Sequence, residues 1–307
     1  MLLILSLAPA LDRYAVADTF RRAQINRPRT VTALAGGKGL NAARTAVRLG
    51  VPTQTLTLVG GSTGETLKRL AAAENLAVTW VDSGVESRQC LSLLDESDGS
   101  LTELYEPVLP VPASVWPPYL AAVPGLLASA DVVAVSGRVP SGLPDDAIAQ
   151  LVGLCVDAGL RVLVDSDGDQ LARAAARRPT LVKVNASEAA AATGTDAEKP
   201  WAGAEALQVM GAGTVVITLG PGGALCLAED GRRLEISHEP LEYALPVGSG
   251  DAFLAALASQ FLGSADLPSA LRFAAAAGRA NARHLQAGSC TPEAVEAELP
   301  GITVREV

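Results

Sequence analysis

The residues with the clearest chemical potential lie in the segment Leu245–Leu257, LPVGSGDAFLAAL. A turn made of Gly248, Ser249 and Gly250 leads here into an alanine- and leucine-rich helix. Glycines let several N–H groups converge, and the positive end of the helix dipole adds to them, so an anion would be stabilised. Asp251 could then accept a proton from a hydroxyl while the turn stabilises a phosphoryl group. The alternative is an ordinary helix start capped by Ser249 or Asp251.

A second glycine-rich segment, AGGKGLNAA, opens another predicted helix. Gly36 and Gly37 would allow a ligand to approach the backbone closely. Lys38 and Asn41 lie about one helical turn apart and could face the same ligand. A binding role is therefore expected for the start of this helix.

The segment KVNASE leaves a predicted strand and enters a helix. Asn185 and Glu188 are three residues apart, so they could face one magnesium ion held through water and nucleotide phosphates. The same spacing is also that of a capping box, in which Asn185 is the N-cap and Glu188 pairs with it. Both interpretations remain open from the residues alone.

Two further charged residues lie where ligands commonly bind. Asp12 follows the apolar run Leu2–Leu7, which predicts a buried strand, and the carboxyl edge of such a sheet is a common ligand site. Asp12 could hold substrate hydroxyls, or it could be a solvated turn carboxylate. Arg88, at the base of a predicted hairpin, could reach a substrate anion, although a surface arginine without a ligand is the commoner case.

The elements that must position these residues alternate between strand and helix, which predicts a doubly wound, mostly parallel sheet. The predicted strands of this body are Leu2–Leu7, Gln54–Val59, Ala77–Val81, Asp131–Ser136, Arg161–Asp165, Thr180–Val184 and Gly213–Leu219, followed by a hairpin over Ala224–Ser237. The predicted helices are one ending at Gly50, then Glu65–Ala73, Asp145–Ala158, Asp169–Arg177, Asp251–Leu262, Leu267–Leu285 with a break near Gly278, and one from Pro292. Pro107–Pro118 is predicted to be an extended connector.

Two segments interrupt this rhythm. Residues Arg13–Leu34 alternate polar and apolar side chains, and Ser87–Tyr105 predicts a hairpin with its turn at Ser97–Ser100. Two insertions that build one small sheet on an α/β body are the arrangement of a lid. We therefore expect one domain over residues 1–307, with a lid sheet from about 13–34 and 87–106.

Composition excludes several classes of function. The net charge of -9 over 307 residues argues against a nucleic-acid partner. Four well-separated cysteines and two histidines have no metal-ligand spacing and form no Ser-His relay. The apolar start has no preceding Lys or Arg, unlike a signal peptide, and no apolar run is long enough to span a membrane. We expect a soluble, cytoplasmic protein.

Taken together, the motifs resemble those of the PfkB-type (ribokinase-like) carbohydrate kinases over essentially the whole chain. GGKGLNAA at 36–43 is similar to the first family signature and PVGSGDAF at 246–253 to the second, with the N-x-x-E pair Asn185 and Glu188 between them. APALD, TELYEP and SGRVPSGLPDD are similar to the branch that contains 1-phosphofructokinase and tagatose-6-phosphate kinase. That branch phosphorylates sugars that already carry a phosphate.

The resemblance implies a three-layer α/β/α sandwich with a mostly parallel central sheet and a small β-sheet lid. It also implies ATP- and Mg²⁺-dependent phosphorylation of a ketohexose monophosphate, such as fructose 1-phosphate, fructose 6-phosphate or tagatose 6-phosphate, at a primary hydroxyl. A homodimer through the lid sheet is implied as well, and a monovalent cation beside the anion-binding turn is left open.

The resemblance also implies a role for each motif residue. Asp251 would be the base, and Gly248, Ser249 and Gly250 the anion hole. Sugar hydroxyls would contact Asp12, Gly36, Gly37 and Asn41; the phosphate already on the sugar would contact Lys38, Arg88 and Arg138, with Arg27 as a further candidate. The nucleotide would contact Lys183, Asn185, Thr218, Gly220 and Gly223, and Asn185 and Glu188 would lie near Mg²⁺.

Some residues depart from the family pattern. Val184 stands where a proline is usual, and Leu245, Pro246 and Ser249 differ within the second signature, but no reactive group is lost. Arg138 stands where related enzymes usually have a small hydroxyl, which leaves the identity of the sugar open. Two alternatives are a kinase for an unphosphorylated sugar or nucleoside, and a sugar-phosphate or nucleotide sensor without turnover.

Overall fold

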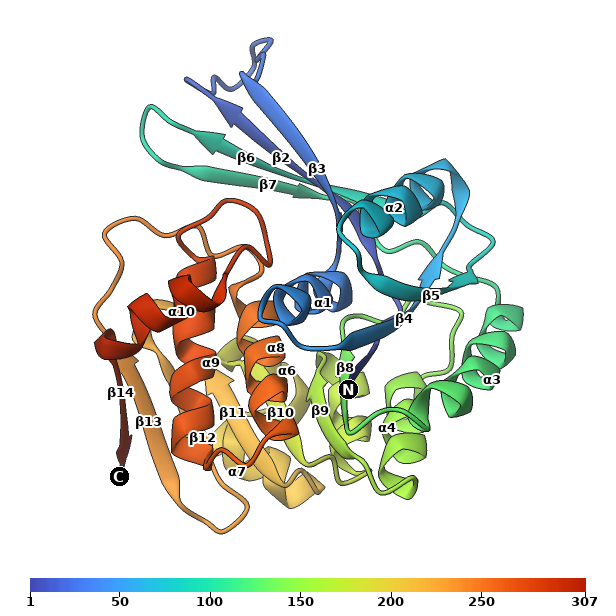
Figure 1. The fold of residues 1–307 in the computed structure, drawn as a ribbon, viewed down its shortest axis with the longest axis vertical. Coiled ribbons are helices and arrows are strands. Elements are labelled where there is room, and N and C mark those ends of the chain that lie inside the picture. The colour runs from blue at the N-terminus through green and yellow to red at the C-terminus, as the bar shows by residue number, and fades with distance from the viewer.

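A ten-stranded sheet forms the centre of the computed structural model, which describes residues 1–307 (Figure 1). Its strands are β1 (Leu2–Leu5), β4 (Thr53–Val59), β5 (Ala77–Asp82), β8 (Val132–Ser136), β9 (Arg161–Asp165), β10 (Leu181–Asn185), β11 (Thr214–Thr218), β12 (Ala224–Leu227), β13 (Arg233–His238) and β14 (Ile302–Glu306). They follow the order β14-β13-β12-β11-β10-β9-β8-β1-β4-β5. Pairing is parallel from β5 to β11 and antiparallel from β11 to β14. The carboxyl ends of seven strands therefore meet at one edge.

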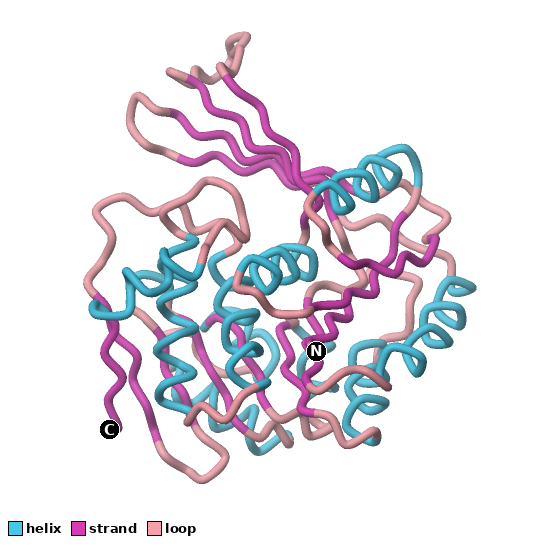
Figure 2. Tube along the Cα trace, viewed as in Figure 1, coloured by secondary structure: helices cyan, strands magenta, loops and turns pink.

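Helices cover both faces of this sheet (Figure 2). One layer contains α1 (Lys38–Arg48), α8 (Ser249–Leu262), α9 (Leu267–Asn281) and α10 (Pro292–Glu298). The other contains α3 (Trp116–Leu127), α4 (Ala147–Asp157), α5 (Gly168–Ala175), α6 (Ala186–Thr193) and α7 (Pro200–Met210). Leu3 and Leu5 of β1 pack into one hydrophobic core, and Leu2 and Ile4 into the other. This two-sided burial explains why the strand is a continuous apolar run.

A four-stranded sheet projects from the body and is called the lid sheet below (Figure 1). It consists of β2 (Ala10–Ala17), β3 (Thr30–Gly36), β6 (Arg88–Asp95) and β7 (Leu101–Tyr105), in the order β3-β2-β6-β7. Helix α2 (Gly61–Ala73) packs at its base, where Leu11, Ala35, Leu40 and Leu67 form a small separate core. The three-layer fold and the hairpin in the lid are thus confirmed.

The lid sheet begins earlier than expected and carries a site residue. Asp12 lies within β2, opposite Leu34 of β3, rather than in a turn after the first strand of the body. The strand predicted over Leu2–Leu7 ends at Leu5, and Ser6 to Pro9 separate β1 from β2. Asp12 is therefore positioned by strand pairing in the lid sheet, next to Cys90 of β6.

Three helix predictions were wrong in detail. Helix α2 starts at Gly61 instead of Glu65, and α3 starts at Trp116, inside the segment predicted to be an extended connector. Helix α9 passes through Gly278 without a break and ends at Asn281. A β-carbon on Gly278 would lie 3.2 Å from the Ser249 carbonyl oxygen, so this glycine allows close helix packing instead of breaking the helix.

Three remaining features concern the C-terminal strand, the cysteines and the character of the helices. Strand β14 was not predicted from the sequence; it pairs with β13 and completes the sheet at that edge. All four cysteines are buried and unpaired. None of the helices combines the length and the apolar character that crossing a membrane would require.

Candidate active site

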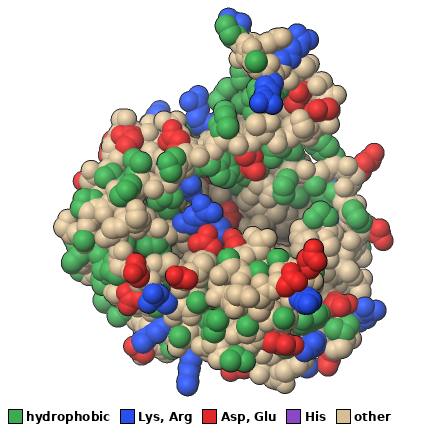
Figure 3. All heavy atoms as spheres, turned by 180° about the vertical axis from the view of Figure 1, so that it is seen from behind, with side chains coloured by type: hydrophobic (Ala, Val, Ile, Leu, Met, Phe, Trp, Pro, Cys, Tyr) green, Lys and Arg blue, Asp and Glu red, His purple; other side chains and the backbone are tan.

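A cavity of about 560 Å³ opens at the carboxyl edge of the central sheet, below the base of the lid sheet. Figure 3 shows this hollow from behind, with cationic and anionic side chains gathered on its wall. The cavity is lined by every residue predicted for the site except Gly36 and Arg27. Segments that lie far apart in the sequence, in both halves of the chain, therefore enclose one cavity.

Asp251 lies in the first turn of α8 and is only 7% exposed. The Asn41 side-chain nitrogen donates a hydrogen bond to its carboxylate, at 3.0 Å. Burial, followed by the nearby charge of Asp165, raises the pKa of Asp251 to about 7, against the lowering effects of Lys38 and Asn41. A carboxylate with a pKa near neutrality suits a general base.

The turn before Asp251 leaves backbone amides free, as the predicted anion site requires. Gly248 has a φ of 74°, and a β-carbon there would lie 2.3 Å from that of Ala287, so only glycine fits. The N–H groups of Gly250 and Asp251 have no acceptor within the chain. Helix α8 has no side-chain cap at all, so the alternative of an ordinary cap by Ser249 or Asp251 is wrong.

A buried cluster of ion pairs lies beneath this turn. Asp165, fully buried at the end of β9, accepts from the ammonium groups of Lys38 and Lys183, both at 2.6 Å. Burial alone would raise the pKa of Asp165, but the two ammonium groups together hold it below its usual value. A β-carbon on Gly250 would lie 2.9 Å from the Lys183 nitrogen, so this cation sits against the turn.

Lys38 is the residue whose surroundings differ most from expectation. Besides Asp165, it pairs with Glu188 at 3.0 Å and so connects the start of α1 with the start of α6. Burial lowers the pKa of Lys38, but the two carboxylates outweigh it and the net shift is upward. Contact with a sugar phosphate remains a prediction, and it would require Lys38 to exchange one of these partners.

At the base of the lid, Asp12 and the first signature hold each other. The Gly37 amide donates to the Asp12 carboxylate at 3.3 Å. A β-carbon on Gly36 would lie 2.0 Å from an Asp12 oxygen, so Gly36 makes room for that side chain rather than for a ligand directly. Burial raises the pKa of Asp12, partly offset by the Gly37 amide and Arg44.

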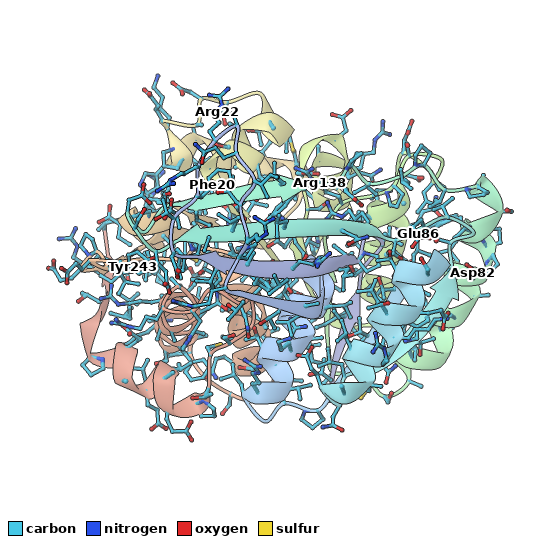
Figure 4. All side chains as sticks on the ribbon, turned by 90° about the horizontal axis from the view of Figure 1, so that it is seen from above. Phe20, Arg22, Asp82, Glu86, Arg138 and Tyr243 are labelled. Atoms are coloured by element: carbon cyan, nitrogen blue, oxygen red, sulfur yellow. The ribbon has the colours of Figure 1, made fainter.

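The three candidate phosphate-binding arginines have different surroundings. Arg88 lines the cavity, and its Nε is buried without an acceptor. Arg138 also lines the cavity, but its side chain is 66% exposed and pairs with Asp167 (Figure 4). Arg27 is exposed in the turn between β2 and β3, where Figure 4 labels Arg22, and does not line the cavity.

At the other end of the cavity, Asn185 and Glu188 form the capping box that their spacing allowed. The Glu188 amide donates to the Asn185 side chain at 2.8 Å, and the Asn185 amide to the Glu188 carboxylate at 2.9 Å. Thr218, Gly220 and Gly223 line the same region. No cluster of three or more His, Cys, Asp or Glu side chains could hold a metal by itself. Mg²⁺ would therefore depend on phosphates and water for most of its ligands.

Two residues that organise the site were not predicted from the sequence. Asp165 ends a parallel strand, so the rule that selected Asp12 would also have selected it. Asn281, on α9, donates to the Val247 carbonyl at 2.8 Å and accepts from the Gly288 amide at 2.7 Å. It lies in an alanine-rich helix with no motif around it, so nothing local indicated that it would tie the turn to a distant loop.

The α/β/α sandwich, the lid sheet at its carboxyl edge and the aspartate in the first turn of a helix with free amides are the features of a ribokinase-like kinase. Residues 1–294 match the sequence profile of the pfkB family carbohydrate kinases. The chain belongs to this family.

Among its relatives, the chain is 30% identical over 283 residues to the ATP-dependent 6-phosphofructokinase isozyme 2 of Escherichia coli (strain K12), covering 90% of each protein. A structure of the E. coli phosphofructokinase-2 in complex with fructose-6-phosphate has a TM-score of 0.85 at 26% identity, covering 97% of this chain and 98% of that one. A possible 1-phosphofructokinase from Thermotoga maritima shares the fold, with a TM-score of 0.90 at 23% identity and 99% coverage of both chains.

Proposed function

We propose that the chain, as a single kinase domain, transfers the terminal phosphoryl group of ATP to a primary hydroxyl of a ketohexose monophosphate. The observation that carries this proposal is the position of Asp251. It is buried at a helix start, beside two unpaired amides and Lys183, in a cavity enclosed by both halves of the chain. The fructose-6-phosphate complex of the E. coli phosphofructokinase-2 supports the substrate class.

In the proposed reaction, Asp251 accepts the proton of the attacking sugar hydroxyl. Phosphoryl transfer passes through a loose transition state, so catalysis depends mostly on positioning and on charge stabilisation. The amides of Gly250 and Asp251 and the ammonium group of Lys183 supply that stabilisation. Closure of the lid sheet would keep out water, which could otherwise accept the phosphoryl group.

The sugar end would use buried side chains. Asp12 and Asn41 bind hydroxyls; Gly37 allows the close approach, and Gly36 makes room for the Asp12 side chain. Arg88 is the best placed cation for the phosphate already on the sugar. Its Nε is buried without an acceptor, and an anion would satisfy it. Lys38 and Arg138 are secondary phosphate contacts, because each already pairs with a carboxylate.

The nucleotide end would hold ATP through Lys183, Asn185 and the loops that carry Thr218, Gly220 and Gly223. Asn185 and Glu188 would hold Mg²⁺ through water and phosphate oxygens, an arrangement that suits this ion. Bound Mg²⁺ neutralises charge on the transferred phosphoryl group.

Two further elements of the proposal concern a cation and the assembly. A monovalent cation would lie beside the turn; the Val247 carbonyl there accepts one hydrogen bond and keeps a second lone pair, and one structure of the E. coli phosphofructokinase-2 contains potassium. A homodimer would form through the lid sheet, where Val31, Leu104 and Tyr105 are exposed. The E. coli enzyme also has a tetrameric inhibited form, so light scattering with and without ATP would measure the assembly.

The proposal is tested by an ADP-release screen across fructose 1-phosphate, fructose 6-phosphate and tagatose 6-phosphate, with fructose and a set of nucleosides beside them. We expect the highest kcat/KM on one of the three sugar phosphates. A higher value on an unphosphorylated sugar or nucleoside would overturn the substrate class. Thermal stabilisation by sugar phosphates without any ADP release would instead indicate a sensor.

A further inference from the structure

Arg44, one helical turn after Asn41 on α1, has no part in the chemistry described above. It is only 1% exposed, and a guanidinium group has five N–H donors and no acceptor. Each donor has an acceptor here. Nε and Nη2 contact the Glu74 carboxylate, Nη2 also contacts the Ala35 carbonyl, and Nη1 donates to the Asn41 side-chain oxygen at 3.2 Å and to the Ala287 carbonyl at 3.3 Å.

The contact with Asn41 determines which way its amide points. An amide side chain has one accepting and one donating end, and Arg44 can only donate. The oxygen of Asn41 must therefore face Arg44, which leaves the nitrogen to face Asp251 at 3.0 Å. The reversed amide would place N–H groups against the guanidinium and oxygen against a carboxylate, and would lose both hydrogen bonds.

A second contact connects Arg44 with the anion-binding turn. Gly248 packs directly on Ala287, where a β-carbon would come within 2.3 Å. The Ala287 carbonyl accepts from Arg44, and its amide donates to the Tyr14 hydroxyl at 3.1 Å. One buried guanidinium thus contacts both the hydrogen-bond donor to Asp251 and the loop that supports the turn.

We propose that Arg44 is a positioning residue for phosphoryl transfer, fixing Asn41 as a donor to Asp251 and holding the loop beneath the turn. This inference rests on the proposed role of Asp251 as the base. The hydrogen bond from Asn41 stabilises the carboxylate form, so its loss would leave less ionised base at neutral pH.

None of the other charged groups around Asp251 is held by Arg44. Lys38 faces it from α1 and Lys183 from β10, and both lower its pKa, while Asp165 of β9 raises it. The Tyr14 hydroxyl approaches from β2 and is un-ionised in the working pH range, because its pKa is raised by burial and by Asp12. A change at Arg44 should therefore act on Asp251 through Asn41.

The test compares the wild type with Arg44→Lys in the acid limb of the pH profile of kcat/KM. Lysine keeps a positive charge opposite Glu74, but its single nitrogen cannot reach all the acceptors of the guanidinium. We expect the apparent pKa of the limb to rise by about one unit, which is about a tenfold loss of kcat/KM at pH 6 and a much smaller loss at pH 9. Arg44→Met serves as a second variant and should shift the limb at least as far.

Two controls separate positioning from general stability. Glu74→Gln removes the buried ion pair but leaves the Asn41 contact, so we expect a lower Tm and an unchanged limb. In an Asn41→Ala background the limb is already shifted, and Arg44→Lys should add nothing to it. An equal shift in Glu74→Gln, or a full additional shift in the Asn41→Ala background, would refute the positioning role.

A readout that does not depend on turnover keeps this inference separate from the proposed function. In NMR spectra, the carboxyl carbon resonance that is absent from the Asp251→Asn variant belongs to Asp251. Its shift with pH reports the ionisation of Asp251 directly. If the wild type released no ADP with any sugar phosphate, the proposed function would fail, while the titration would still test Arg44. A wild type active in the screen, with the same Asp251 titration in Arg44→Lys, would reject this inference alone.

Discussion

The two ends of the cavity are built differently. At the proposed sugar end, Asp12, Asn41 and Arg44 are buried side chains. Asp12 accepts a hydrogen bond from the Gly37 amide, and Asn41 accepts one from Arg44. At the nucleotide end, Gly220 and Pro221 are exposed, and the loop after β13, which carries Tyr243, is largely exposed (Figure 4). The sugar end is therefore preorganised, whereas the nucleotide end consists mainly of loop backbone that a ligand must complete.

This difference suggests how the site divides its tasks. Preorganised side chains lose little entropy on binding and discriminate between hydroxyl patterns. Loop backbone and a helix start bind phosphates without needing particular side chains. Asp251 and Asp165 lie where the two ends meet, so substitutions there should have the largest effects, followed by the sugar end and then the nucleotide end.

Asp251→Asn should have the largest effect on activity. The amide cannot accept the hydroxyl proton, and removing a general base typically costs about 10²- to 10⁴-fold in rate. We expect that loss in kcat on the best sugar phosphate, with binding of both substrates retained in thermal-shift titrations. Asp230→Asn, on an exposed turn, is the control, and turnover within tenfold of the wild type in Asp251→Asn would contradict the account.

Asp165→Asn should destabilise the protein where the two ends of the cavity meet. It leaves Lys38 and Lys183 facing each other without their shared carboxylate. Removing one partner of a buried ion pair costs roughly 3–5 kcal/mol, so urea denaturation should show a loss of that size. Asp167→Asn, which removes only the exposed pair with Arg138, should cost less than about 1 kcal/mol. Equal losses of unfolding free energy in the two variants would show that the ion-pair cluster around Asp165 does not hold the two ends of the cavity together.

Much of this arrangement could be predicted from the sequence, because the glycine turns and strand ends carry local signals. The positions of Asp251, Lys183 and Asn185 follow from such signals. The partner of Lys38 could not be predicted, since only the fold brings α1 beside the end of β9. Helix α3 was missed because its prolines suppress the helix signal. Pro117 and Pro118 lie in the first turn, where proline is tolerated, and Pro124 needs tertiary support.

Arg88→Ala should affect the sugar end alone. A charge-assisted hydrogen bond to phosphate contributes about 1.5–3 kcal/mol, so KM for the sugar phosphate should rise roughly ten- to a hundredfold. KM for ATP should stay the same. Arg13→Ala, at an exposed position of the neighbouring strand β2, is the matched control and should change neither constant. Equal effects on both KM values would indicate that Arg88 does not belong to one end of the cavity.

Thr218→Ala should have the smallest effect. Its hydroxyl donates to the Val184 carbonyl at 3.3 Å, and the backbone around it provides most of the proposed nucleotide contacts. We expect KM for ATP to rise by less than about fivefold, which corresponds to about 1 kcal/mol, with no change in KM for the sugar phosphate. A rise in KM for ATP as large as the rise in KM for the sugar phosphate in Arg88→Ala would mean that side chains dominate binding at both ends of the cavity.

The most direct test of the central claim, that Asp251 is the base, is the pH dependence of wild-type kcat/KM for the sugar phosphate at saturating MgATP. The base must be deprotonated, and burial raises the pKa of Asp251 to about 7, so activity should fall as the pH drops through 7. Phosphorus resonances of the free sugar phosphate give the substrate's own ionisation. The account predicts an additional ionisation near 7. A profile explained by the substrate alone would contradict it.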